Sequence, residues 1–162
     1  MITREVNDKP GTARALLGLA RVAQAQRDHP TWRALLEEAQ ALGREVGDKN
    51  VQADACMGQG HLLLELGETA AARSCCEEGL ALRRAGDNSY GIAAALLEAG
   101  HAAWLQGEHG VTQSHAREAL GLFQERKDKE GVLAALESLG VAALAGRRQE
   151  RACLLYTSPS PR

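Results

Sequence analysis

The sequence predicts an all-α fold built from stacked antiparallel helical hairpins, and three observations lead to this class. The first is an internal repeat of about 40 residues, in which small and apolar residues return at fixed positions. The second is helical spacing of the apolar residues in both halves of each repeat. The third is composition, since aromatic residues make up only 3% of the chain and alanine, leucine and glycine fill most apolar positions. Such residues favour closely packed helices over strands.

The 40-residue register can be followed column by column. One column holds only the smallest side chains, Ala20, Gly60, Gly100 and Gly140. Other columns contain Glu38, Glu78 and Glu118; Ala39, Gly79 and Ala119; and Leu42, Leu82 and Leu122. Turn aspartates keep the period to within one residue, at Asp8, Asp48, Asp87 and Asp128. Because small residues let two helices approach to about 8 Å, we expect the helices of each hairpin to meet at these small columns.

The register divides the chain into four repeats, at about 10–46, 48–86, 87–127 and 128–152, the last of them incomplete. In the third repeat we expect one helix from about Gly91 to Gln106 and a second from about Val111 to Arg126. In the second repeat, Gly67 is expected to take the left-handed conformation after the first helix, and Thr69 is expected to cap the second. The first helix of the fourth repeat is expected over 131–146.

The last ten residues, 153–162, depart from the pattern, because Pro159 and Pro161 fall where the preceding repeat has helical residues. The string CLLYTSPSPR resembles the in-frame translation of a sequencing-library adapter, which predicts a non-native tail and a natural chain interrupted near Ala152. A natural disordered Ser-Pro tail is the alternative. At the other end, Val6-Asn7-Asp8-Lys9 resembles the turn that precedes each later repeat, so the array is expected to extend upstream.

Composition and charge limit the function classes. No apolar run approaches the roughly 20 residues that a membrane span needs, and the N-terminus lacks the features of a secretory signal, so we expect a cytoplasmic protein without a membrane partner. The 19 basic and 21 acidic residues form no basic stripe, which disfavours direct binding of nucleic acid.

Patterns that would indicate catalysis are absent from the sequence. There is no phosphate-binding GxxxxGK[ST] loop, HExxH, GxSxG or CxxC motif, so we predict no enzyme activity, catalytic residue, cofactor or metal. Cys56 and Cys76 fall on core columns and are interpreted as small buried residues. His61 and His101 share a column and invite a metal or pH-switch hypothesis, but two histidines without a third ligand are weak evidence, and polar helix surface is the alternative.

With these columns in place, the chain from about Thr12 to Ala152 resembles a tetratricopeptide repeat array of the longer, 40-residue kind. The resemblance rests on QGHLLLELGETAAARSCCEEGLALRRAGDN and on LLEAGHAAWLQGEHGVTQSHAREALGLFQERKDKEGVLAALESLGVAALAG. It implies a right-handed α-solenoid of about 3.5 repeats. The array is similar in particular to the C-terminal repeats of bacterial regulators of the MalT and LuxR type. This similarity implies a sensor or partner-binding segment that follows an ATPase module in a larger transcriptional regulator. A stand-alone adaptor and a repeat appendage of an enzyme are the alternatives.

The resemblance also implies a concave groove lined by the first helix of each repeat, with a protein or peptide as partner. Carried over by register, the candidate binding residues are Leu17, Arg21, Gln24, Met57, His61, Leu64, Leu97, His101 and Trp104, followed in the fourth repeat by Glu137, Val141 and Leu144. The Lys and Asn pairs with which the family clamps a carboxylate are absent. Trp104 is expected either to anchor a ligand or to pack on the neighbouring hairpin. Exposed leucines near the interrupted end are expected to favour self-association.

Overall fold

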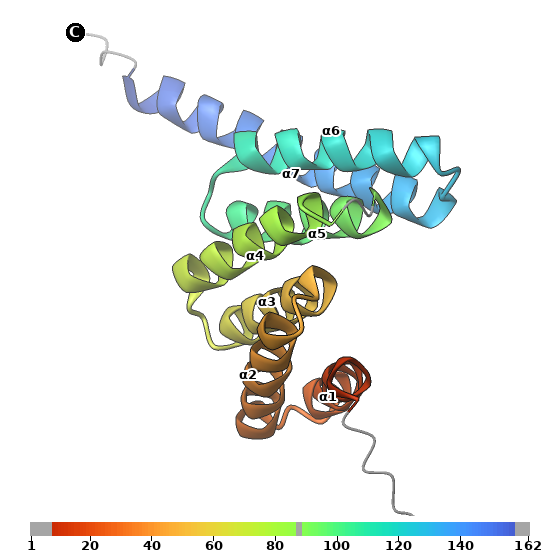
Figure 1. Cartoon of the computed structure of the whole chain (residues 1–162). Coiled ribbons are helices and arrows are strands. Elements are labelled where there is room, and N and C mark those ends of the chain that lie inside the picture. The colour runs from red at the N-terminus through yellow and green to blue at the C-terminus, as the bar shows by residue number, and fades with distance from the viewer. Residues whose placement is uncertain (1–7, 87–88, 158–162) are drawn as a thin grey trace, which may run out of the picture. The chain divides into compact units, whose positions relative to one another are not determined.

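A computed structural model describes residues 8–86 and 89–157, and within these ranges every regular element is an α-helix (Figure 1). The helices are α1 (Lys9–Ala25), α2 (His29–Glu45), α3 (Lys49–Glu65), α4 (Thr69–Arg84), α5 (Ser89–Leu105), α6 (His109–Glu125) and α7 (Lys129–Thr157). The chain forms two compact units, Met1–Asn88 with α1 to α4 and Ser89–Arg162 with α5 to α7. The all-α prediction is confirmed. Among the described residues, no helix combines the length and apolar character needed to cross a membrane.

The helices begin at residues 9, 29, 49, 69, 89, 109 and 129, so the 40-residue repeat consists of two 20-residue halves. An aspartate just before several of these helices accepts hydrogen bonds from their first-turn N–H groups. The Asp48 carboxylate, for example, accepts from the N–H groups of Asn50 at 2.9 Å and Val51 at 3.2 Å. The prediction that Thr69 caps α4 is wrong, because Thr69 is the first helical residue and Glu68 holds the cap position without a side-chain hydrogen bond. Asp87 lies outside the described residues.

The turns that end the helices also follow the 20-residue spacing. Gly67 has the predicted left-handed conformation, with φ of 79°, and Gly107 repeats it. Arg27 and Lys127 take the same conformation at φ of 56° and 57° although they carry a Cβ. The N–H group after each of them donates back into the preceding helix, from Asp28 to the Ala23 carbonyl and from Asp128 to the Phe123 carbonyl, both at 3.0 Å. These hydrogen bonds close the two turns even without glycine.

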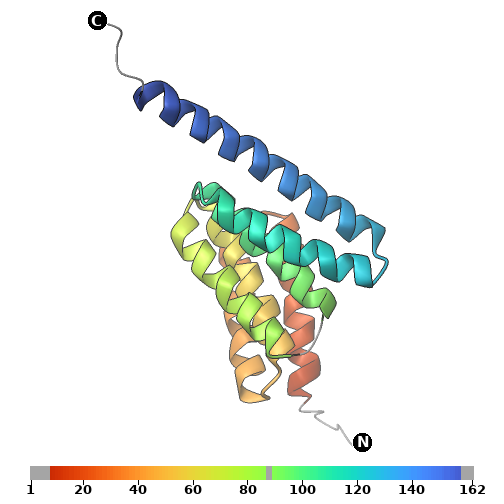
Figure 2. The same ribbon diagram turned by 90° about the horizontal axis from the view of Figure 1, so that it is seen from above.

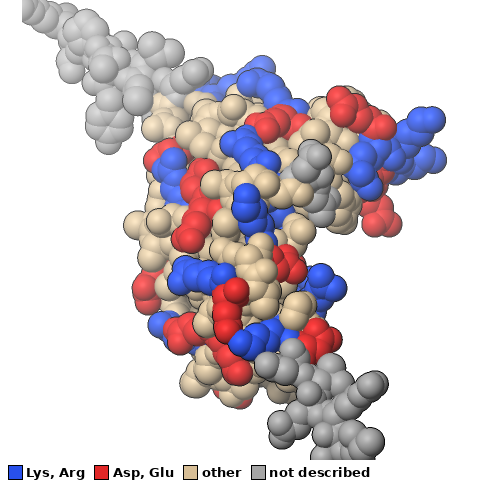
Figure 3. Space-filling view, viewed as in Figure 1, with Lys and Arg blue, Asp and Glu red and all other residues tan. Residues whose placement is uncertain are grey.

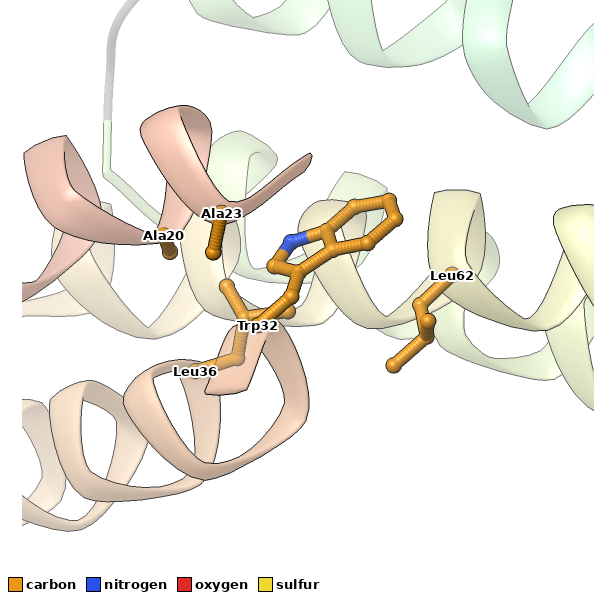
Figure 4. Close-up of a cluster of buried hydrophobic side chains, with 5 residues drawn as sticks. All are labelled: Ala20, Ala23, Trp32, Leu36 and Leu62. Atoms are coloured by element: carbon orange, nitrogen blue, oxygen red, sulfur yellow. The ribbon is translucent and has the colours of Figure 1, made fainter. Parts of the chain in front are cut away.

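In the unit of Met1–Asn88, α1 pairs with α2 and α3 with α4, while α2 also packs on α3. The α1–α2–α3 junction contains a buried cluster of five side chains, drawn in Figure 4: Ala20, Ala23, Trp32, Leu36 and Leu62. The Trp32 side chain is only 1% exposed, and its ring lies among residues of all three helices. The small residues of α1 make room for this ring, because alanine side chains leave space that a leucine would fill.

The small column brings the helices of a hairpin together, as predicted, in three of its four positions. Ala20 is 1% exposed, and a Cβ added at Gly60 would lie 2.6 Å from the Cys76 sulfur of α4. At Gly100 a Cβ would lie 3.5 Å from the Cβ of His115 in α6. Gly140 differs, since it is exposed and nothing lies within 4 Å of its Cβ position. The reason is that α7 packs on α6 and α5, and no described helix follows it.

In the unit of Ser89–Arg162, α5 pairs with α6, and α7 packs on both (Figure 2). The expectation that the first helix of the fourth repeat ends near Gly146 is wrong, because α7 continues to Thr157 and extends past the start of α6. Arg148 stands where Asp28 and Asp128 cap the helices that follow them, and no proline follows until Pro159, so nothing local stops α7. The side chains near the end of α7 and residues 158–162, which include most of the predicted non-native tail, lie outside the described residues.

The cysteine thiols of the first unit are predicted to be unreactive in the folded chain. Cys56 and Cys76 are fully buried, as the core interpretation requires, and Cys75 is half-buried. Burial, reinforced by the nearby Glu78 carboxylate, raises the pKa of Cys56 from 9.0 to about 11. At pH 8 we therefore expect alkylation of Cys56 by iodoacetamide, followed by peptide mass spectrometry, to be slower than in the unfolded chain by at least roughly 100-fold.

The raised pKa of Cys56 also makes the stability of the fold depend on pH. Between pH 9 and about 11 the thiol ionises in the unfolded chain and stays neutral in the folded one, so the free energy of unfolding falls as the pH rises through this window. A Cys56→Ala variant is expected to lose that part of the alkaline destabilisation. Equal alkylation rates in folded and unfolded protein would contradict the buried placement of Cys56.

Candidate functional site

The candidate site is a cavity of about 420 Å³ formed within the second unit. Its lining comes from three helices and consists of Leu97, His101 and Trp104 of α5, Thr112 of α6, and Ala134, Glu137, Ser138 and Val141 of α7. All three groove residues that the register predicted on α5 therefore line one cavity. Their counterparts 40 residues later, Glu137 and Val141, complete the opposite wall.

Helical spacing explains why these side chains converge. On α5, Leu97, His101 and Trp104 are separated by four and three residues, which places them on one face of the helix. On α7, the residues at 134, 137, 138 and 141 form the same kind of stripe. The two stripes face each other because α5 and α7 pack directly together, as first helices of successive repeats.

Thr112 connects the cavity wall to the hairpin core. This residue is 2% exposed, and its hydroxyl donates to the Gly100 carbonyl at 3.0 Å or to the Glu108 carbonyl at 3.3 Å. The absence of a side chain at Gly100 leaves that carbonyl accessible to α6. The hydrogen bond fixes α6 against α5 just behind the cavity, so the α5 wall is supported by a satisfied polar contact.

An aromatic pair forms one wall. The His101 and Trp104 rings are stacked, with centroids 6.2 Å apart and an angle of 17° between their planes. His101 is exposed and Trp104 is half-buried. The Trp104 indole nitrogen is buried and has no hydrogen-bond acceptor among the described residues. Trp104 thus combines accessible apolar surface with an unused donor, which are properties of a binding anchor.

The lining is mainly apolar and has a single carboxylate. Leu97, Trp104, Ala134 and Val141 provide the apolar surface, and Val141 is 50% exposed. Glu137 is exposed and has no ion pair or hydrogen bond with the described part of the chain. On the face shown in Figure 3, acidic and basic side chains alternate without an extended field of one sign. The carboxylate in the cavity is therefore a local feature of this site.

The other six predicted groove residues lie in the first unit, and their positions differ. Met57 is 8% exposed, and its sulfur lies where a Cβ at Gly79 of α4 would be, so it packs inside the α3–α4 hairpin. Leu17 is half-buried against the Trp32 cluster. Arg21 is exposed, whereas Gln24, His61 and Leu64 are half-buried. These residues belong to α1 and α3, which pack together as α5 and α7 do.

A different cavity, of about 310 Å³, lies between α2, α3 and α4 of the first unit. It is lined by Arg33, Glu37, Gln40, Gln59, Leu62, Leu63 and Cys75. The Gln59 amide donates to the Gln40 side-chain oxygen at 3.3 Å, and the Gln40 amide donates to the Cys56 sulfur at 3.2 Å. These internal bonds use the Gln40 amide group and one N–H of Gln59. The sequence did not single out this cavity, because its residues come from the second helix of one repeat and from both helices of the next.

Three lining residues of the α5–α7 cavity were missed by register alone, namely Thr112, Ala134 and Ser138. Ala134 and Ser138 could have been found, because they are the helical neighbours of Glu137 and Val141. Thr112 could not, since its role depends on the carbonyl of Gly100. No group of three metal-ligating side chains occurs among the described residues, and His61 lies in the first unit whereas His101 lies in the second.

The hairpins, their 20-residue half-period and the small columns define a helical-repeat fold of the tetratricopeptide-like class. A solved Rap protein, in the crystal structure titled "Rap Protein Complexed with Competence and Sporulation Factor", matches with a TM-score of 0.77 at 18% sequence identity. The match covers 93% of this chain and 42% of that one, so the present chain spans less than half of the Rap protein. No family model matches the sequence, and no curated protein matches it. The likeness shows the fold class.

Proposed function

We propose that the chain is a protein-interaction module that binds a peptide segment in the cavity between α5 and α7. The observation that carries this proposal is the convergence of predicted groove residues from two successive repeats on one cavity. A volume of about 420 Å³ suits one or two amino-acid side chains of a larger partner. In support, the Rap protein of similar fold is described as a complex with Competence and Sporulation Factor.

The lining favours an aliphatic side chain next to a basic one. Leu97, Trp104 and Val141 offer apolar contact to a leucine, isoleucine or valine side chain. Glu137 offers a carboxylate to a neighbouring lysine or arginine, and the stacked His101–Trp104 pair offers an aromatic face to the same cation. An acidic peptide would meet the Glu137 carboxylate without a compensating cation in the lining. We therefore propose a ligand of aliphatic and basic character.

The wider role that we propose is the sensor or partner-binding segment of a larger bacterial signal-responsive transcriptional regulator with an ATPase module. This part of the proposal is supported by the resemblance of the repeats to those of MalT and LuxR type regulators. A stand-alone adaptor, or the repeat appendage of an enzyme, would use the same cavity in the same way. The proposed binding chemistry does not depend on which of these contexts holds.

The test is selection of displayed peptides against the intact chain, followed by titration of the enriched peptides with tryptophan fluorescence as the signal, in which Trp104 is expected to respond while the buried Trp32 gives a constant background. We expect enriched sequences to pair an aliphatic residue with lysine or arginine. A Trp104→Ala variant is expected to weaken binding at least roughly tenfold, measured by calorimetry because the fluorophore is lost. A Glu137→Lys variant is expected to weaken binding of basic peptides by several-fold and to shift selection toward acidic ones.

A matched control is available on the same helix. Leu105 is 42% exposed on α5 but does not line the cavity, so Leu105→Ala should bind with the affinity of the unmodified chain. Enrichment of peptides whose binding is insensitive to both Trp104→Ala and Glu137→Lys would place the binding site elsewhere and overturn the proposal.

A further inference from the structure

The cavity between α2, α3 and α4 has the composition of a second ligand site, separate from the α5–α7 cavity. It lies wholly within the first unit, where the first repeat packs on the second. Its volume of about 310 Å³ is at the lower end of the roughly 300–1,000 Å³ that small-molecule sites span. A ligand that fills this cavity must therefore be small.

The apolar part of the lining consists of Leu62, Leu63 and Cys75. Leu62 is 2% exposed, and the other two side chains are half-buried. Burial, reinforced by the nearby Glu78 carboxylate, raises the pKa of the Cys75 thiol. The thiol is therefore neutral at pH 7 and adds to the apolar surface. This surface suits an aliphatic group of a ligand, whereas a charged group placed there would lose its hydration without compensation.

Gln59 supplies unused hydrogen-bonding groups to the cavity. Its amide donates one N–H to the Gln40 side-chain oxygen at 3.3 Å, and the Gln40 amide donates to the Cys56 sulfur at 3.2 Å. The Gln59 side-chain oxygen and its second N–H have no partner in the described part of the chain. Gln59 therefore offers one acceptor and one donor to a ligand, in an orientation that the bond to Gln40 fixes.

Two exposed side chains of opposite charge complete the lining. Arg33 and Glu37 are four residues apart on α2, so they share one face of that helix. Neither forms an ion pair or a hydrogen bond with the described residues. Arginine before glutamate is the less favourable order for a direct pair at this spacing, which leaves both groups available to a ligand. The lining thus presents one positive and one negative charge.

We propose that this cavity binds a free α-amino acid with an aliphatic side chain, such as leucine, isoleucine or valine. The carboxylate of the ligand pairs with Arg33, its ammonium group pairs with Glu37, and its side chain lies on the apolar part of the lining. A purely anionic ligand would meet the Glu37 carboxylate, and a purely cationic one would meet the Arg33 guanidinium. Only a zwitterion satisfies both charges.

The first test is calorimetric titration of the intact chain with L-leucine at pH 7. We expect saturable binding with a dissociation constant below roughly 1 mM. L-leucinamide lacks the carboxylate and N-acetyl-L-leucine lacks the ammonium group, so each should bind at least roughly tenfold more weakly. The proposal is overturned if leucine, isoleucine and valine all fail to bind at roughly 10 mM, or if either blocked form binds as tightly as leucine.

Matched variants of α2 locate the site. Arg33→Gln and Glu37→Gln should each raise the dissociation constant of leucine at least roughly tenfold, and both should fold normally because these side chains are exposed. Arg44→Gln and Glu38→Gln make the same charge changes at exposed positions outside the cavity, so they should bind leucine like the unmodified chain. Equal losses in the controls, or no loss in Arg33→Gln and Glu37→Gln, would place the amino acid elsewhere and refute the assignment.

Methyl NMR of the chain, titrated with unlabelled leucine, gives a local readout. The Leu63 methyl signals should shift, whereas those of Leu19, which is 55% exposed on α1 and does not line the cavity, should not. Leucine that binds without shifting the Leu63 signals would contradict the proposed position. A Trp104→Ala variant should lose the peptide binding of the second unit and keep leucine binding, so the two proposals can fail independently.

Discussion

Replacing Trp32 by alanine is expected to lower the free energy of unfolding of the first unit by about 3–5 kcal/mol. Trp32 is 1% exposed and contacts residues of α1, α2 and α3, so its removal empties the place where three helices meet (Figure 4). The surrounding residues are mostly small or fixed on helices, which limits how far they can collapse into the space. The cost should therefore include a cavity contribution in addition to the lost burial of the ring.

The measurement is urea denaturation followed by circular dichroism, combined with hydrogen exchange resolved by peptide. We expect the loss of protection to concentrate in peptides from residues 8–86, because the cluster lies wholly within the first unit. Trp104 remains as the fluorophore of the second unit and reports whether that unit unfolds at the same denaturant concentration. Trp32→Phe, which keeps much of the ring volume, should lose clearly less stability. A Trp32→Ala variant with the midpoint of the unmodified chain would show that the ring is not part of the core.

The sequence predicted the fold because the determinants of a helical repeat are local and recur. Residues such as Ala20, Gly60 and Gly100 could be aligned without knowing any contact, and the structure places each of them where two helices meet. Gly67 was assigned to a left-handed turn from residue type alone, and its φ of 79° confirms it. The helix expected to end at about Arg126 ends at Glu125, although the left-handed turn that follows, at Lys127, has no glycine.

The fourth repeat departs from the predicted pattern at Gly140 and near Gly146. Gly140 keeps the register of the small column but has no neighbouring helix, since the column acquires its contacts only when a second helix packs on it. The turn expected near Gly146 likewise does not form. Arg148 replaces the capping aspartate that is present at Asp28 and Asp128, so no local signal starts a new helix there. Register thus predicts a position in a repeat, while the contact made there depends on the neighbouring elements.

The candidate site was predictable on α5 and in part on α7, where Glu137 and Val141 line the cavity as the register predicts and Leu144 does not. Leu97, His101 and Trp104 line one cavity because they share a helix face and a register that the sequence displays. Met57 occupies an equivalent column but is buried against Gly79, because the glycine in α4 leaves a space that a flexible thioether fills. In the third repeat, Ala119 stands where α4 has Gly79, and Leu97 at the Met57 column remains at the cavity wall. The choice between core and groove at this column therefore depends on the residue opposite.

A leucine at Gly60 is expected to lower the free energy of unfolding by about 1–3 kcal/mol, through overpacking between α3 and α4. Even the Cβ of an alanine there would lie 2.6 Å from the Cys76 sulfur and 3.3 Å from the Ala72 carbonyl oxygen. Cys76 is fully buried and the carbonyl belongs to the backbone of α4, so the hairpin itself must open to admit the larger side chain. Gly60→Ala should cost less than Gly60→Leu, because alanine adds only a Cβ, and its helix preference over glycine, about 1 kcal/mol, offsets part of the strain.

The other two glycines of this column, Gly100 and Gly140, provide controls that separate the effect of packing from that of helix propensity. At Gly100 the added Cβ would make ordinary contacts of 3.5 to 3.8 Å with His115 and Thr112, so Gly100→Ala should be neutral or stabilising, whereas Gly100→Leu should cost about 1–3 kcal/mol. At Gly140 nothing lies within 4 Å, so both substitutions should be tolerated when measured at low protein concentration. The three alanine variants, compared by thermal and urea unfolding, should therefore rank Gly60 as least stable and Gly140 as most stable relative to the unmodified chain. Equal effects at Gly60 and Gly140 would mean that the column does not set the distance between α3 and α4, and would leave helix propensity as the only role of its glycines.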